Sequence, residues 1–133
     1  MDNYVAHGAL DTYRATRVPM ADDDTDPHRL IDMLMERALA RIAIAKGHML
    51  RGDIAEKGAH VGGAMAIIDG LRAFLDHEAG GEISVNLDNL YEYMSRRLVE
   101  ANMRDDVEIL DEVSALMREI RGAWVAIGSQ QPS

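Results

Sequence analysis

The stretch from residue 80 to residue 124 constrains the fold of this chain more than any other part of the sequence. Two consecutive glycines at its start favour a turn over a continued helix. Two apolar series follow, and their spacings of three and four residues mark one face of an α-helix each. Between them, Asp105 is a predicted N-cap, and Glu108 stands where it can reach back to the cap. The stretch therefore predicts two antiparallel helices, over residues 83–103 and 106–127.

Two further helices are predicted upstream, over residues 27–51 and 54–78. Asp26 is followed by proline, which is a strong helix start because the aspartate can cap and proline suits the first helical position. Gly52 is expected to end this helix, and Asp53 is expected to cap the next one. Short connections make successive helices antiparallel neighbours, so the predicted fold class is all-α, an up-down four-helix bundle.

The ends of the chain carry weaker patterns than the bundle. The apolar residues near the N-terminus are too few for a helix that is stable alone, and three aspartates then form a predicted solvated loop. We expect three parts: a loosely attached segment at 1–25, flexible or short-helical, the bundle at 26–128, and a disordered tail at 129–133.

The second predicted helix is apolar almost all round in its C-terminal half, which is more than one face of a bundle helix can bury. Two interpretations remain open for the surplus. Its small residues allow tight packing against neighbouring helices, or the surplus forms a groove for a helix of another protein. We assign Met65, Ile68 and Leu75 to the bundle core, and Ile67, Leu71 and Phe74 to the groove.

Composition excludes several classes of function. The net charge of -9 lacks the basic excess of nucleic-acid-binding proteins and disfavours anionic membrane surfaces. No apolar run approaches the roughly 18 residues of a membrane span, and the N-terminus lacks the pattern of a secretory signal. The absence of cysteine excludes disulfides, thiolate metal sites and thiol nucleophiles, and it permits a reducing cytoplasm.

Motifs for catalysis and for cofactors are also missing. No glutamate has a histidine three residues later, so the di-iron signature of helical bundles is absent. No phosphate-binding loop and no nucleophile elbow occur. The five histidines are scattered without a pair at metal-binding spacing in one helix. We therefore expect no enzyme activity, no cofactor and no metal site.

One ordered series of short strings resembles the FliS family of flagellin-specific export chaperones. It comprises Gly80-Gly81-Glu82-Ile83, Asn86-Leu87, Leu90-Tyr91-Glu92-Tyr93-Met94, Arg96-Arg97-Leu98, Glu100-Ala101-Asn102 and Ala123-Trp124. The resemblance extends upstream to Asp26-Pro27-His28-Arg29-Leu30 and to the Gly52-Asp53 turn, so it covers nearly the whole chain.

This resemblance implies a cytoplasmic chaperone. Such a protein binds the C-terminal amphipathic region of flagellin, prevents premature polymerisation and aids delivery to the flagellar type III export apparatus. The implied N-terminal segment carries Leu10 and Tyr13, which would occlude the groove or dock at the export gate. The client-binding residues expected on the bundle are Ile67, Leu71, Phe74, Leu90, Met94 and Leu116.

Two other classes of function are weighed against the chaperone. One is a regulatory bundle that sequesters another flagellar or transcription-regulatory protein, and the other is a self-associating bundle, which leaves a homodimer open. Mixing the protein with a flagellin C-terminal peptide separates them. One-to-one binding supports the chaperone, whereas concentration-dependent dimerisation alone supports self-association.

Overall fold

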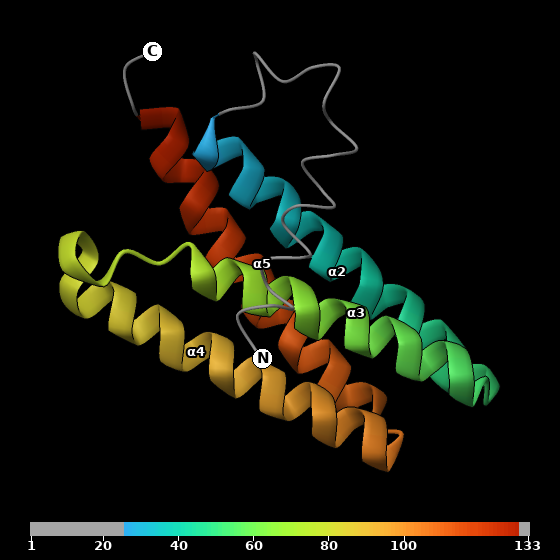
Figure 1. Ribbon diagram of the computed structural model, residues 1–133. Coiled ribbons are helices and arrows are strands. Elements are labelled where there is room, and N and C mark those ends of the chain that lie inside the picture. The colour runs from blue at the N-terminus through green and yellow to red at the C-terminus, as the bar shows by residue number, and fades with distance from the viewer. Residues whose placement is uncertain (1–25, 131–133) are drawn as a thin grey trace.

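The structure, a computed structural model, describes residues 26–130. Its elements are four α-helices: α2 (Pro27–Arg51), α3 (Ile54–Ala73), α4 (His77–Arg104) and α5 (Val107–Gln130). Successive helices run in opposite directions (Figure 1), and the described residues contain no strand. The predicted all-α, up-down four-helix bundle is confirmed. Leu10 and Tyr13 lie outside the described residues.

The four helices pack as a closed ring. Helices α2 and α4 each approach α3 and α5 closely, whereas the backbones of the diagonal pairs stay further apart. Each helix turns an apolar stripe toward the centre, as the spacing of three and four residues requires. The largest fully buried side chains are Met35, Ile42, Ile68, Leu71, Met94, Leu98, Leu110, Val113 and Met117.

The first connection follows the sequence prediction in part. The Asp26 carboxylate accepts a hydrogen bond from the His28 backbone N–H at 3.0 Å, and Gly52 ends α2 with φ of 77°. Asp53 takes the predicted N-cap position of α3, but its side chain makes no capping hydrogen bond to that helix. Its Oδ2 instead lies 3.1 Å from His48 Nδ1 and 3.3 Å from Arg51 Nε, so side chains of the preceding helix occupy it.

The break between the second and third helices falls earlier than predicted. Helix α3 ends at Ala73 rather than near residue 78, and α4 begins before the two glycines. The Asp76 carboxylate caps α4 by accepting from the backbone N–H groups of Glu78 at 3.1 Å and Ala79 at 3.0 Å. Gly81, with φ of 52° and ψ of -125°, then interrupts the helical backbone, so the predicted break at the glycines is present as a kink between the first turn of α4 and the rest of the helix.

The turn between α4 and α5 corrects the predicted cap. Asp105 is the left-handed residue that closes α4, with φ of 52° and ψ of 46°. Asp106 is the residue that caps α5, since its Oδ1 accepts from the Glu108 N–H at 2.9 Å. Aspartate tolerates the left-handed conformation and also caps helices, so spacing alone could not show which of the two aspartates caps α5.

None of the four described helices combines the length and the apolar character that crossing a membrane would require.

Candidate functional site: an apolar cleft between helices α4 and α5

One end of the bundle is open. Helices α4 and α5 are joined by a short turn at one end, and Figure 1 shows the beginning of α4 well apart from the end of α5. A cavity of about 580 Å³ lies there, lined by the N-terminal half of α4, the C-terminal half of α5, the end of α3 and the first turns of α2. We call this cavity the cleft.

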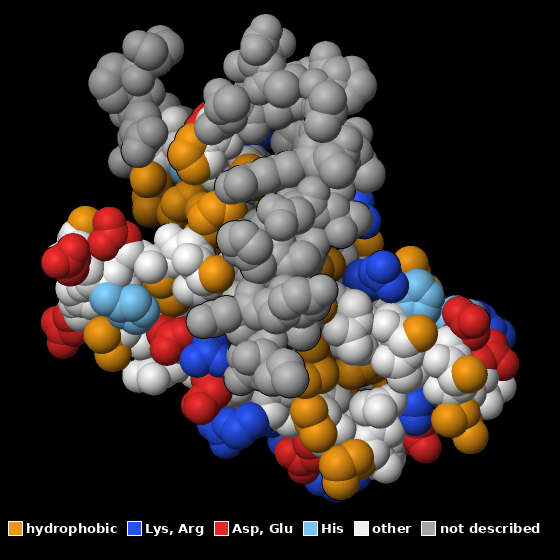
Figure 2. All heavy atoms as spheres, viewed as in Figure 1, with side chains coloured by type: hydrophobic (Ala, Val, Ile, Leu, Met, Phe, Trp, Pro, Cys, Tyr) orange, Lys and Arg blue, Asp and Glu red, His pale blue; other side chains and the backbone are white. Residues whose placement is uncertain are grey.

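The lining of the cleft is almost entirely apolar. Its floor contains buried side chains, among them Met35, Leu71 and Tyr91. Its walls are half-buried, and they comprise Phe74, Leu75, Leu87, Leu90, Leu116, Ile120 and Trp124. Figure 2 shows hydrophobic side chains gathered over the C-terminal half of α5, on the side facing α4. Burial raises the pKa of the Tyr91 phenol to about 12, so the tyrosine is neutral at physiological pH.

The polar groups near the start of α4 are engaged by the backbone. The Asp76 side chain caps α4, and Ser84 Oγ donates to the Asp76 carbonyl at 2.9 Å. A methyl group at position 80 would collide with the Ser84 hydroxyl, which explains why a glycine stands there. The wall of the cleft at this point therefore offers apolar surface and few polar groups in need of a partner.

A paired contact between His28 and Trp124 fixes the wall formed by α5. Their rings stack with centroids 4.5 Å apart and planes 10° apart. The indole Nε1 donates to the His28 carbonyl at 2.8 Å, and His28 Nε2 donates to the Trp124 carbonyl at 2.6 Å. A side chain at Gly128 would overlap the imidazole ring. The start of α2 therefore holds Trp124 in place at the edge of the cleft.

Ion pairs hold the walls to the rest of the bundle. Arg72 donates to Asp88 at 2.7 and 3.3 Å, which ties the end of α3 to α4. This guanidinium holds the pKa of the Asp88 carboxyl below its usual value. On the other side, Arg121 of α5 donates to Asp32 at 2.6 Å and to Glu36 at 3.0 Å, both on α2. The cleft is thus positioned from both sides before any partner arrives.

Halfway along the bundle, α4 and α5 are joined by a polar cluster. The Tyr93 hydroxyl donates to Glu112 at 2.5 Å, and Arg97 Nε donates to the same carboxylate at 2.8 Å. The hydrogen bond from Tyr93, with the Arg97 guanidinium beside it, lowers the pKa of Glu112. These contacts favour the anionic form of Glu112, and the cluster ties the helices together below the cleft.

The structure brings together four of the six predicted client-binding residues. Leu71, Phe74, Leu90 and Leu116 line the cleft. Ile67 and Met94 do not line it, and both are buried in the core. The client-binding role of all six stays a prediction.

Leu71 departs from the expectation that its strip is open to water, because its side chain is only 2% exposed. It forms the floor of the cleft and part of the core at once. Leu75, which the sequence analysis assigned to the core, also lines the cleft. Helix α3 ends at Ala73, so Leu75 lies in the connection to α4, where it packs against the core and also borders the cavity.

Much of the cleft wall was not predicted from the sequence. Leu87, Ile120 and Trp124 belong to the same apolar series as Leu90 and Leu116, so the signal was present. Periodicity identifies the inward face of a helix, but it does not show where along that face the neighbouring helix diverges.

The fold and the cleft together define a class of protein: an all-α bundle with an open apolar cleft of the kind that suits an amphipathic helix. Comparison with known proteins is more specific. The family model described as flagellar protein FliS matches residues 6–131, and this chain belongs to the FliS family.

Named relatives agree with that assignment over most of their length. The chain is 50% identical over 119 residues to the flagellar secretion chaperone FliSB of Pseudomonas aeruginosa, covering 90% of this chain and 94% of the relative. It is 42% identical over 125 residues to the flagellar secretion chaperone FliS of Salmonella typhimurium, covering 93% and 92%. It is 38% identical over 117 residues to the chaperone of the same name of Vibrio cholerae, covering 88% and 86%.

Proposed function

We propose that the cleft binds the C-terminal amphipathic region of flagellin, so that flagellin does not polymerise before export. The chain is a flagellar export chaperone, as its family and its named relatives indicate. Binding would take place in the cytoplasm, and the complex would deliver flagellin to the type III export apparatus. The names of the relatives favour export over the alternative regulatory role.

The observation that supports this client is the unsatisfied apolar surface between α4 and α5. Half-buried leucines on both helices face the cleft instead of each other. Exposed apolar side chains continue this surface at the rim, with Ile83 70% exposed and Ile127 49% exposed. A surface of this kind fits the apolar face of a helix, which presents side chains at every third and fourth position.

The polar surroundings are consistent with a helical client. The cleft walls are held by ion pairs on their outer sides, so an apolar helix can enter without breaking a buried charge pair. Burying half-exposed leucines contributes about 25 cal/mol for each Å² removed from water. The leucine side chains of the cleft would thus be half-buried in the free protein and fully buried in the complex.

Calorimetric titration with a flagellin C-terminal peptide tests the proposal. We expect one peptide to bind each chain, and we expect Leu116→Ala to weaken binding about fivefold or more, because an anchor in a groove carries over about 1 kcal/mol. Leu50→Ala is the matched control, since Leu50 is an exposed leucine of α2 that does not line the cleft. Equal affinities for both variants would place the client elsewhere.

The roles of Leu10 and Tyr13 stay predictions. If the N-terminal segment occludes the cleft, deletion of residues 1–18 should strengthen peptide binding by a factor equal to the reciprocal of the fraction of open molecules. If the segment docks at the export gate, deletion should leave peptide binding unchanged and impair secretion.

A further inference from the structure

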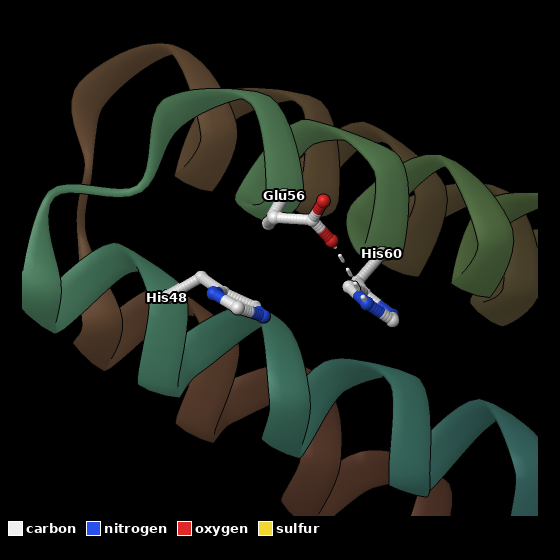
Figure 3. Close-up of side chains that lie close together, drawn as sticks. All are labelled: His48, Glu56 and His60. Carbon is white, nitrogen blue, oxygen red and sulfur yellow. Dashed lines mark ion pairs between the residues drawn. The ribbon is translucent and has the colours of Figure 1, made fainter.

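A cluster of potential metal ligands lies at the other end of the α2–α3 hairpin from the cleft. His48 belongs to the last turns of α2, and Glu56 and His60 belong to the first turns of α3 (Figure 3). One ligand atom of each residue lies within 4.8 Å of those of the other two. The two imidazole rings stack with centroids 5.6 Å apart and planes 12° apart.

We propose that His48, Glu56 and His60 bind a divalent transition-metal ion of the Zn²⁺ type. Two imidazoles and one carboxylate form a donor set that zinc accepts, with water completing a tetrahedron. Ligands at zinc distances lie about 3.4 Å from one another. His60 Nε2 and Glu56 Oε1 are already 3.8 Å apart, and Glu56 can move because its side chain is 62% exposed.

Asp53 supplies the supporting contact that such a site requires. Its Oδ2 lies 3.1 Å from His48 Nδ1. When this nitrogen carries the proton and donates it to the carboxylate, Nε2 keeps its lone pair for the metal. Metal-bound histidines are commonly oriented by a carboxylate in this way.

Two arginines compete with the metal for the same imidazoles. Arg41 Nη1 lies 3.2 Å from His60 Nδ1, and Arg51 Nη2 lies 3.1 Å from His48 Nδ1. A guanidinium can only donate, so these contacts require the tautomer without a proton on Nδ1. Metal binding through Nε2 therefore releases Arg41 from His60. Removing the Arg41 guanidinium should consequently strengthen metal binding.

No metal site was expected from the sequence, because no single helix carries the Glu-x-x-His motif or a histidine pair of metal-binding spacing. His48 and His60 stand on two helices and approach only when the hairpin closes at Gly52. The spacing of four between Glu56 and His60 places them on one face of α3, and this was the available signal.

The test is a calorimetric Zn²⁺ titration of the full chain without a histidine tag, combined with thermal melts. We expect one Zn²⁺ per chain and a melting temperature that rises with Zn²⁺, since a ligand of the folded state stabilises it. Glu56→Gln should weaken binding at least tenfold, and His60→Gln should abolish it. Arg41→Gln should strengthen it.

Two matched controls separate this site from binding elsewhere on the surface. Glu92→Gln removes an exposed carboxylate that also lies four residues from a side-chain partner, and His77→Gln removes an exposed histidine at the start of α4. Both should bind Zn²⁺ like the wild type. The proposal is overturned if the wild type shows no saturable binding, or if Glu56→Gln and His60→Gln bind as tightly as the controls. Because Glu56 is exposed, Glu56→Gln should fold like the wild type. Its Zn²⁺ affinity therefore tests the proposal in every case.

Discussion

The two ends of the α4–α5 pair differ in how deeply their leucine side chains are buried. Near the turn that joins the helices, Leu98 and Leu110 are fully buried in the core. At the other end, Leu90 and Leu116 stand on the same apolar series but are only half-buried and line the cleft. The pattern of residue types is continuous, whereas the packing is not.

Polar contacts reinforce the closed end. The ammonium group of Lys57, on a side chain only 7% exposed, contacts the Asp105 carboxylate and donates to the Asn102 carbonyl at 3.0 Å. Lys46 of α2 donates to Asp111 of α5 at 2.9 Å. The closed end therefore provides stability, and the open end keeps apolar surface available. We infer that a chaperone bundle must leave some apolar side chains of its core-facing series partly exposed.

The largest expected effect comes from the closed end. Leu98→Ala should lower the free energy of unfolding by about 2 to 5 kcal/mol, because it leaves a cavity in a fully packed region. The folded fraction should bind the flagellin peptide with unchanged affinity. Denaturant unfolding measures the stability, and calorimetry measures the peptide affinity. If Leu98→Ala weakens binding by more than its unfolded fraction accounts for, the two ends do not differ in function as described.

Leu71→Ala should affect both quantities, because Leu71 is buried and also forms the floor of the cleft. We expect a loss of roughly 2 to 3 kcal/mol in stability and weaker peptide binding. Ile68→Ala, at a fully buried position outside the cleft, is the matched control and should lower stability alone. Identical binding by the two variants would show that the floor does not contact the client.

Leu90→Ala should weaken peptide binding and lower stability only slightly, which is the reverse of the effect expected for Leu98→Ala. Its side chain is half-buried in the free protein, so we expect a stability loss of about 1 kcal/mol. Peptide affinity should fall about fivefold or more. Thermal melts beside titrations measure this ratio, and a stability loss as large as that of Leu98→Ala would mean that the cleft is closed in solution.

The smallest expected effect concerns pH. The Arg72 guanidinium lowers the pKa of Asp88 in the folded state, so this ion pair stabilises the fold above the unfolded pKa of about 4. The contribution is lost as the pH falls through the lower folded value. Both side chains are about one third exposed, so we expect less than about 1 kcal/mol. Asp88→Asn should be less stable than the wild type at pH 7, and the two melting curves should converge at low pH.

The sequence predicted the bundle well because its main signals are local. Helix periodicity and the cap at Asp26 depend on neighbours in the chain, and both are confirmed. The connections were predicted less well, because several aspartates compete for each cap. Asp76 caps a first turn of α4 ahead of the glycines, which lie at the kink, and Asp106 rather than Asp105 caps α5.

The cleft was predicted only in part for a different reason. Leu90 and Met94 have the same pattern in the sequence, yet one lines the cleft and the other is fully buried. The difference arises from the divergence of α4 and α5, which depends on contacts such as His28 with Trp124 across the chain. The approach of His48 to His60 is likewise set by two helices together.

The most direct test of the central claim uses Trp124, which is the single tryptophan of the chain and lines the cleft. Its fluorescence should be measured while a flagellin C-terminal peptide without tryptophan is added. The account predicts a shift of the emission to shorter wavelength that saturates at one peptide per chain, because the client removes the indole from water. Calorimetric binding of the same peptide without any change in Trp124 emission would contradict it.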